Sequence, residues 1–173
     1  MLTPDHIREA LGVLRRMFGY IVVDMGSALQ DLVLAIFDVA DRILLVVTPE
    51  IPSVKNARLF FEVADALGYP EGKIKLILNK ADRQIPIGPK EIVAGIKHPV
   101  FLTIPSDARV ACMSVNQGIP CILCNRNSAI SQGIAKLAQL LAKELQPIEQ
   151  AVAGMPVVRK EPGGLLSRLL GKR

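Results

Sequence analysis

The sequence predicts an α/β fold in which a parallel sheet is covered by helices on both faces. Short apolar runs alternate along the chain with longer helical patterns, which is the order of elements in βαβ units. The runs are apolar at nearly every position, as in strands that are buried on both sides. With 173 residues, 50% of them hydrophobic, the chain is long enough for one domain with a sizeable core.

The first part of the chain is expected to form three helices and two strands. Thr3 is suited to the N-cap of an amphipathic helix that has Pro4 at its first position. The later elements follow from apolar periodicity and from the Gly and Pro residues that end them. We therefore expect helices over Thr3 to Phe18, Gln30 to Val39 and Pro52 to Leu67, and strands over Tyr20 to Asp24 and Arg42 to Val47.

The second part repeats the alternation with two more strands. A strand over Lys73 to Leu78 runs directly into Asn79, and a strand over Val100 to Ile104 ends at Pro105. The helices expected around them cover Lys90 to Ile96, Ala108 to Gln117 and Ser128 to Leu145. We place the boundary of this body at residue 146, before a flexible linker over residues 147–162 that contains Pro and Gly.

The charge distribution gives no strong nucleic-acid signal. The formal net charge is +5, but five basic residues and only one acidic residue follow Val157, so the body is nearly neutral. No apolar run is long enough to span a bilayer. The start of the chain, MLTPDHIREALG, lacks a basic-then-apolar leader, and three cysteines do not suggest a disulfide framework. We expect a cytoplasmic protein.

A polar cluster follows each of the four expected strands. These clusters are Asp24 with Gly26, Thr48 with Glu50, Asn79 with Asp82, and Ser106 with Asp107. Because the carboxyl ends of parallel strands lie at one edge of a sheet, the clusters should converge on a common crevice. For Thr48 or Ser106 taken singly, the role of helix cap or turn former is favoured. Asp24, between an apolar strand and a glycine-bearing loop, is a candidate Mg²⁺ ligand.

The segment Asn79-Lys80-Ala81-Asp82 has the N-K-x-D pattern by which many GTPases recognise guanine. A carboxylate at Asp82 would accept hydrogen bonds from the ring N–H and the amino group of that base. The match is short, but its position after a buried strand strengthens it. Contact with some purine is favoured over specificity for guanine.

Four segments, taken in order, resemble the MinD/ParA group of deviant P-loop ATPases, and most of all its CpaE-type branch. They are YIVVDMGSAL, ADRILLVVTPEIPSVKNAR, LGYPEGKIKLILNKAD and PVFLTIPSD. The resemblance covers nearly the whole chain and corresponds to the C-terminal two thirds of the family's domain. It implies a P-loop NTPase-like fold, three layers with a parallel sheet in the middle, that is incomplete here.

The resemblance also implies the roles of individual residues. Asp24 would end the Walker B strand and bind Mg²⁺ through water, and Met25, Gly26 and Ser27 match the second switch, where many members have a Pro-containing turn. The residues expected to flank the adenine of ATP are Asn79, Lys80 and the loop Pro105, Ser106 and Asp107, with Asp82 as a further nucleotide contact.

The phosphate-binding loop is not found in this sequence. No segment matches G-x-x-x-x-G-K-[ST], and Gly72-Lys73 precedes a strand rather than a helix. The resemblance places that loop upstream of Met1. Either the chain is a fragment of a longer ATPase, or it is a degenerate member that works without hydrolysis. The first is favoured because missing central strands would expose sheet edges and apolar faces, which a dimer partner could otherwise cover.

Cys121 and Cys124 form a C-x-x-C pair. Zinc would need further ligands, and Cys112, His6 and His98 lie at no recognisable spacing. A redox pair usually opens a helix, whereas this pair lies in an apolar, strand-like segment. Buried, inert cysteines are therefore expected.

Residues 163–173 are expected to form an amphipathic, membrane-targeting tail. On a helix, Leu165, Leu166, Leu169 and Leu170 share one face while Arg168 points outward, a pattern typical of helices that lie on anionic membranes. The stretch also resembles the C-terminal tail of MinD. A helix that docks on the body or on a partner is the alternative.

The sequence thus favours an ATP-binding, nucleotide-switched spatial regulator that positions pilus, secretion or cell-division proteins. ATP and Mg²⁺ would serve a complete member as cofactors, a homodimer would be the active form, and the inner face of the cell membrane would be a peripheral location. This chain alone is not expected to hydrolyse ATP. The alternatives are a non-hydrolytic localisation scaffold that binds membrane and partner proteins, and a GTPase that uses the NKAD segment.

Overall fold

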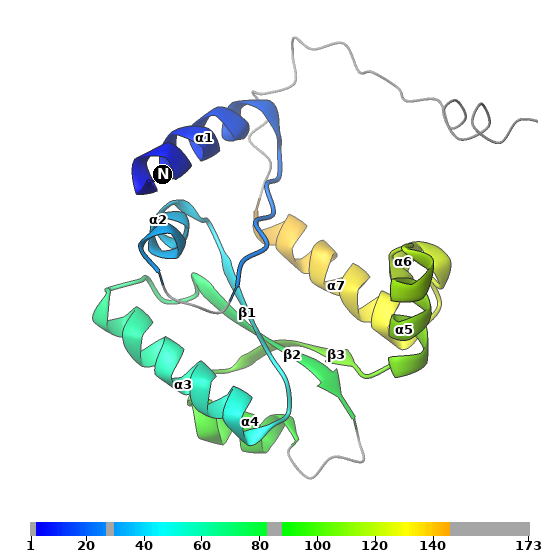
Figure 1. Cartoon of the computed structure of the whole chain (residues 1–173). Coiled ribbons are helices and arrows are strands. Elements are labelled where there is room, and N and C mark those ends of the chain that lie inside the picture. Colours follow the sequence, from blue (N-terminus) through cyan, green and yellow to red (C-terminus); the bar gives the residue numbers. More distant parts are fainter. Residues whose placement is uncertain (1–2, 27–29, 83–87, 146–173) are drawn as a thin grey trace, which may run out of the picture.

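The computed structural model describes residues 3–26, 30–82 and 88–145, and it has the expected α/β architecture (Figure 1). Ser27, the linker and the tail lie outside these ranges. The described elements are α1 (Pro4–Met17), α2 (Asp31–Val39), β1 (Ile43–Val47), α3 (Ile51–Ala66), β2 (Ile74–Ala81), α4 (Pro89–Ile96), β3 (Val100–Pro105), α5 (Ala108–Gln117), α6 (Cys121–Cys124) and α7 (Ala129–Glu144).

The sheet has the order β1-β2-β3, and both pairs of neighbouring strands are parallel. The β1–β2 ladder is regular from Ile43 opposite Ile74 to Val47 opposite Leu78. The β2–β3 ladder is irregular after Leu76 and again between Leu78 and Ala81. The sheet therefore changes its backbone geometry near the carboxyl end of β2, where the sequence predicts a site.

Two apolar clusters hold the helices against the sheet. On one face, Leu76 and Leu78 of β2 pack with Phe61 of α3 and Ile92 and Ile96 of α4. On the other face, a cluster centred on Ile77, Leu102 and Ile104 packs with Ile130, Ile134, Leu137 and Leu140 of α7. Figure 1 shows α3 and α4 on one side of the sheet and α7 on the other. The three-layer arrangement is confirmed.

The helix boundaries follow the capping signals in the sequence. Thr3 is the N-cap of α1, and its side-chain oxygen accepts a hydrogen bond from the backbone N–H of His6. Gly118 ends α5 with a φ of 62°, a left-handed conformation that glycine adopts without strain. These local rules explain why the predicted helices are found within a few residues of their expected bounds.

The strand predicted over Tyr20 to Asp24 is wrong for this structure. The segment has no regular secondary structure and belongs to no sheet, so the described residues contain three strands instead of four. Val22 is 92% exposed, and Tyr20 is 52% exposed with its hydroxyl donating to the Leu145 carbonyl at 3.3 Å. Apolar, β-branched residues favour an extended backbone, but a strand also needs a neighbour with which to pair.

The prediction for the C-x-x-C pair also needs correction. Cys121–Cys124 is a single turn of helix, α6, and not a strand-like segment. Pro120 precedes it at the N-cap, a place where a residue without an N–H costs little. Cys121 and Cys124 are half-buried and Cys112 is exposed, so the three free thiols are not buried as expected. The expected strand-like setting therefore no longer counts against a redox role for Cys121 and Cys124.

Candidate functional site

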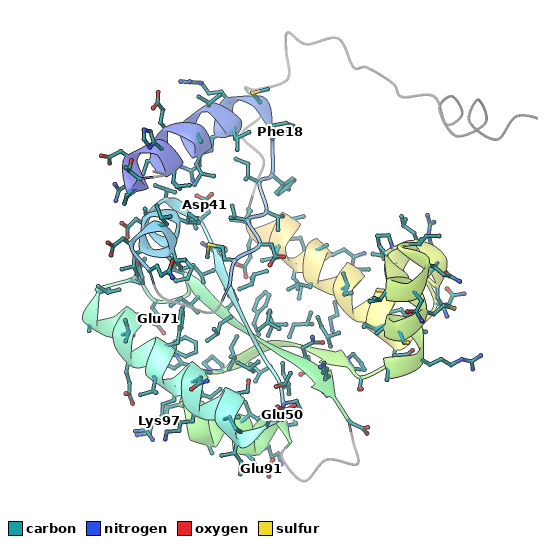
Figure 2. The ribbon with its side chains drawn as sticks, viewed as in Figure 1. Phe18, Asp41, Glu50, Glu71, Glu91 and Lys97 are labelled. Carbon is teal, nitrogen blue, oxygen red and sulfur yellow. The ribbon has the colours of Figure 1, made fainter. Side chains whose placement is uncertain are left out.

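The carboxyl ends of the strands bring two of the predicted polar clusters together. At the end of β2, Ala81 lies opposite Pro105 of β3, and the N–H of Ser106 donates to the Ala81 carbonyl at 2.8 Å. Asn79, Lys80 and Asp82 are thus next to Pro105, Ser106 and Asp107 in the fold, although more than twenty residues separate them in the sequence. Figure 2 shows Asp41 and Glu50, which flank β1, at opposite ends of that strand. The candidate nucleotide site lies at the Glu50 end.

The end of β2 carries an unusual backbone conformation. Lys80 has a φ of 53°, within the ladder irregularity between Leu78 and Ala81. The backbone N–H of Lys80 donates to the side-chain oxygen of Asn79 at 2.9 Å. A left-handed conformation is costly for a lysine, and such strain is concentrated at functional sites. Asn79 is half-buried at this turn and Lys80 is exposed, so an amide and a cation border the same edge.

Asp107 and Thr48 take part in local backbone structure. One side-chain oxygen of Asp107 accepts the N–H of Val110 at 3.0 Å and caps α5. The N–H of Thr48 donates to the hydroxyl oxygen of Ser53 at 3.0 Å, at the start of α3. The helix cap at this edge is therefore Asp107, whereas Thr48 takes part through its backbone N–H alone, and the half-buried carboxylate of Asp107 lies beside the end of β3.

Asp24 lies in the irregular segment before Met25, Gly26 and Ser27, the residues that the resemblance matches to the second switch. Its side chain is exposed, Met25 is half-buried and Gly26 is exposed, while Ser27 falls outside the described ranges. Over residues 3–26, 30–82 and 88–145, no group of three or more His, Cys, Asp and Glu side chains is placed to hold a metal ion.

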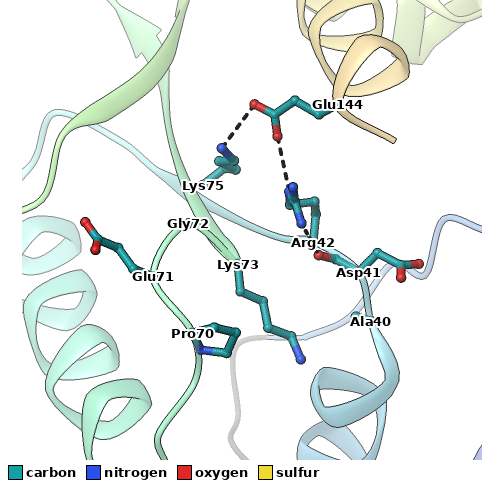
Figure 3. A pocket seen from close by; sticks show the side chains of 9 residues that line it. All are labelled: Ala40, Asp41, Arg42, Pro70, Glu71, Gly72, Lys73, Lys75 and Glu144. Atoms are coloured by element: carbon teal, nitrogen blue, oxygen red, sulfur yellow. Dashed lines mark hydrogen bonds and ion pairs between the residues drawn. The ribbon is translucent and has the colours of Figure 1, made fainter. Parts of the chain in front are cut away.

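A depression of about 540 Å³ lies at the other end of the sheet (Figure 3). It is lined by Ala40, Asp41, Arg42, Pro70, Glu71, Gly72, Lys73, Lys75 and Glu144. Glu144, at the end of α7, binds Arg42, which directly precedes β1, at 3.2 Å and Lys75 of β2 at 3.1 Å. The hydrogen bonds from Lys75 and then Arg42 lower the pKa of Glu144 below its ordinary value.

The cations of this depression are already engaged within the fold. Lys73 donates to the Asp38 carbonyl at 3.2 Å and lies over the Tyr69 ring, 4.9 Å from its centroid. Arg42 and Lys75 share Glu144. We therefore assign the depression a structural role, the attachment of the end of α7 to β1 and β2. No sequence pattern predicts this attachment, because Glu144 is 102 residues from Arg42.

Within the described residues, no helix is both long enough and apolar enough to cross a membrane. The predicted membrane contact rests on residues 163–173, which lie outside those ranges.

Two curated proteins are similar to this chain over most of its length. It is 28% identical over 153 residues to the septum site-determining protein MinD of Thermotoga maritima, with 86% of this chain and 56% of that protein covered. It is 30% identical over 161 residues to an uncharacterized ATP-binding protein of Methanocaldococcus jannaschii, with 92% and 57% covered. The chain thus spans a little more than half the length of these relatives. No protein-family model matches it.

Solved structures share the fold. A ParA family ATPase from Chlorobium tepidum has a TM-score of 0.74 at 24% identity, with 80% of this chain and 57% of that chain covered. MinD of Pyrococcus horikoshii, solved with Mg-ADP, has a TM-score of 0.68 at 24% identity and coverages of 82% and 57%. The MinC:MinD cell division complex of Aquifex aeolicus gives 0.66 at 22% identity, with 90% and 60% covered. The likeness in sequence to MinD and the fold shared with these structures confirm the resemblance read from the four sequence segments: over most of its length the chain is similar to MinD/ParA-family ATPases.

Proposed function

We propose that this chain supplies the base-binding side of a MinD/ParA-type ATP site and acts in a nucleotide-switched spatial regulator. The observation that carries the proposal is the junction of β2 and β3, where the Ser106 N–H donates to the Ala81 carbonyl and brings two predicted base-binding segments to one edge. The relatives named as ATP-binding and the MinD structure with Mg-ADP support a nucleotide at this edge.

Asn79 is the proposed base-recognition residue. Its side-chain oxygen already accepts the Lys80 N–H, so the amide N–H groups are the part suited to an acceptor nitrogen of adenine. Lys80 and the segment Pro105 to Asp107 would border the base, and Asp24 with Met25, Gly26 and Ser27 would serve the metal side. Bound Mg²⁺ would neutralise phosphate charge. Because no phosphate-binding loop occurs in this sequence, we do not expect hydrolysis by this chain alone.

The cellular role we propose is positioning of other proteins. The names of two similar proteins support it: a septum site-determining protein, and a MinD bound to MinC in a cell division complex. By the sequence resemblance, the apparatus is a pilus, secretion or division machine and the branch is CpaE-like. Homodimer formation and membrane contact through residues 163–173 complete the proposal. Flotation on anionic vesicles with and without these residues tests the membrane part, and equal flotation would rule it out.

Titration calorimetry with ATP and GTP, each with Mg²⁺, tests the nucleotide part. We expect weak, saturable ATP binding that Asn79→Ala reduces by about tenfold or more. Asn116→Ala is the matched control, because this amide contacts Cys112 on α5 rather than the strand ends. Binding of neither nucleotide would contradict the proposal and favour the non-hydrolytic scaffold.

The GTPase alternative has its own test. If Asp82 reads the guanine base, Asp82→Asn should weaken GTP binding and leave ATP binding unchanged. If the parent chain and Asp82→Asn bound GTP with equal affinity, the GTPase alternative would be excluded.

A further inference from the structure

The short helix α6 carries two thiols one helical turn apart, outside the segments assigned to the nucleotide. Cys121 is the first residue of α6 and Cys124 is its last. In helical geometry, Cα atoms three residues apart are separated by about 5 Å. Disulfide bonds form across Cα separations of about 4.4–6.8 Å. The backbone of α6 therefore meets the main distance requirement for a bond between its two cysteines.

The Cys124 side chain points back toward Cys121. Its thiol donates to the Cys121 carbonyl at 3.7 Å, so the sulfur of one cysteine lies against the backbone of the other. Side chains on a helix lean toward its N-terminus, which is the direction of this contact. An S–H group is a weak donor, so little is lost when Cys124 exchanges this contact for a bond to the other sulfur.

Hydrogen bonds on both sides of α6 hold the turn in place. Before the helix, the Ser114 hydroxyl donates to the Ile119 carbonyl at 2.6 Å. After it, the Ser128 hydroxyl donates to the Asn125 carbonyl at 2.9 Å, and the Asn125 N–H donates to the Cys121 carbonyl at 2.8 Å. The helix also contacts both α5 and α7 (Figure 1). Because the fold fixes the spacing of the thiols, closing a ring between them costs less entropy.

Both thiols of α6 are accessible to a small reagent. Cys121 and Cys124 are half-buried, and Leu123 between them is 61% exposed. Fully buried cysteines are inert, whereas partly exposed cysteines can react. Cys112, the third thiol, is exposed on α5, where its sulfur accepts the Asn116 amide N–H at 3.5 Å. It serves as an internal control, an accessible cysteine that is not part of the pair.

We propose that Cys121 and Cys124 are a reversible redox pair, which a small disulfide such as oxidised glutathione converts into an intramolecular disulfide. The thiolate of one cysteine attacks a sulfur of oxidised glutathione, a protein–glutathione disulfide forms and one glutathione thiolate leaves. The thiolate of the other cysteine then attacks the protein sulfur of this mixed disulfide, and the second glutathione thiolate leaves. Each departing thiolate takes up a proton that a protein thiol has lost. Two protein thiols are thus oxidised and one glutathione disulfide is reduced.

Reaction of the reduced full chain with mixtures of reduced and oxidised glutathione, in the absence of air, tests the proposal. Acid quenching, alkylation of the remaining thiols and peptide mass mapping then show which cysteines are bonded. We expect a bond between Cys121 and Cys124 within one chain, an alkylated Cys112, and the return of all thiols with excess reduced glutathione. The proposal is overturned if the pair stays reduced, carries glutathione without closing, or bonds through Cys112.

Two single substitutions separate the pair from the third thiol. Cys112→Ser should form the disulfide as the parent does. Cys124→Ser should stop at one glutathione bound to Cys121, because the second attacking thiol is gone. Circular dichroism checks that both variants are folded. A Cys112→Ser chain that no longer forms the bond, or a Cys124→Ser chain that closes a ring through Cys112, would contradict the assignment.

The same exchange in urea measures what the folded turn contributes beyond the spacing of the two cysteines in the sequence. We expect the equilibrium constant for ring closure to be about tenfold or more larger in the folded chain than in the unfolded chain, because the fold holds the thiols one turn apart. Equal constants in the two states would show that α6 does not prepare the pair for this reaction, and the proposal would fail.

Discussion

The side-chain oxygen of Asn79 accepts the backbone N–H of Lys80 at 2.9 Å, and Lys80 holds a φ of 53° next to it. A left-handed conformation costs an L-residue about 1–2 kcal/mol, whereas glycine adopts it freely. Lys80→Gly should therefore leave the free energy of unfolding unchanged or raise it by up to about 1 kcal/mol, and Lys80→Val should lower it by about 1 kcal/mol or more. Urea denaturation measures both changes.

Lys97 provides a matched control for that prediction. It has a φ of 64° at the end of α4, away from the candidate site. Lys97→Gly should have the same small effect on stability and no effect on nucleotide binding, whereas Lys80→Gly should weaken binding if the side chain borders the base. Equal binding by the two variants would remove the Lys80 side chain from the site.

Ile77 is the central side chain of the core beneath α7, with no exposed surface. Ile77→Ala removes buried methyl groups and leaves a cavity, so we expect the free energy of unfolding to fall by about 2–5 kcal/mol. Leu59→Ala is the comparison. The Leu59 side chain is 50% exposed on α3, so its truncation should lower the free energy of unfolding by well under half as much as Ile77→Ala does. Similar losses for the two variants in urea denaturation would contradict the packing described here.

Local signals were enough to predict the helices and most of the sheet. Caps such as Thr3, periodic apolar residues and stops such as Gly118 act within a few residues, so they can be read without the fold. The same is true of the parallel order, which follows from the alternation of strands and helices. Because the strands are parallel, the Asn79 and Ser106 clusters are expected at the same edge of the sheet.

Pairing and long-range contacts were not predictable in the same way. The composition of Tyr20 to Asp24 favours a strand, but whether a strand forms depends on a neighbour that a sequence window cannot show. The Glu144 bridge to Arg42 and Lys75 joins residues far apart in the chain. The short helix at Cys121 was missed because four apolar residues have no readable period.

Tyr69 should give the protein an alkaline stability limit. Its hydroxyl donates to a side-chain oxygen of Asp38 at 3.0 Å, and burial, followed by this bond, raises its pKa from 10.0 to about 12. A raised pKa contributes stability below pH 10 that is lost as the pH climbs toward 12. The melting temperature of Tyr69→Phe should be lower than that of the parent at pH 8, and this difference should shrink above pH 10.

The chain offers a direct check on that titration. The chain has two tyrosines, Tyr20 and Tyr69. In the Tyr20→Phe variant, the ultraviolet signal of tyrosinate therefore comes from Tyr69 alone. A folded-state midpoint near pH 10 in this variant would show that the hydrogen bond to Asp38 does not hold the proton as proposed.

Glu144 should give the protein a complementary acid dependence. The hydrogen bond from Lys75, then that from Arg42, lowers the pKa of this carboxyl from its ordinary 4.5, against the opposing effect of desolvation. A depressed pKa contributes stability above the unfolded-state value, and that stability is lost as the pH falls through the folded-state value. Glu144→Gln keeps the shape of the side chain but loses both ion pairs, so it should melt below the parent at pH 7.

The two melting curves should approach each other as the pH falls below 4.5, because the parent carboxyl then becomes neutral as well. Lys143→Gln, one residue earlier in α7, tests whether any charge change at this helix end has the same effect. If Glu144→Gln and Lys143→Gln lowered the melting temperature equally and without dependence on pH, the attachment of α7 would not rest on the pair of contacts to β1 and β2. If only Glu144→Gln lowered the melting temperature, and only at pH above 4.5, the attachment of α7 would rest on the contacts of Glu144 with Arg42 and Lys75.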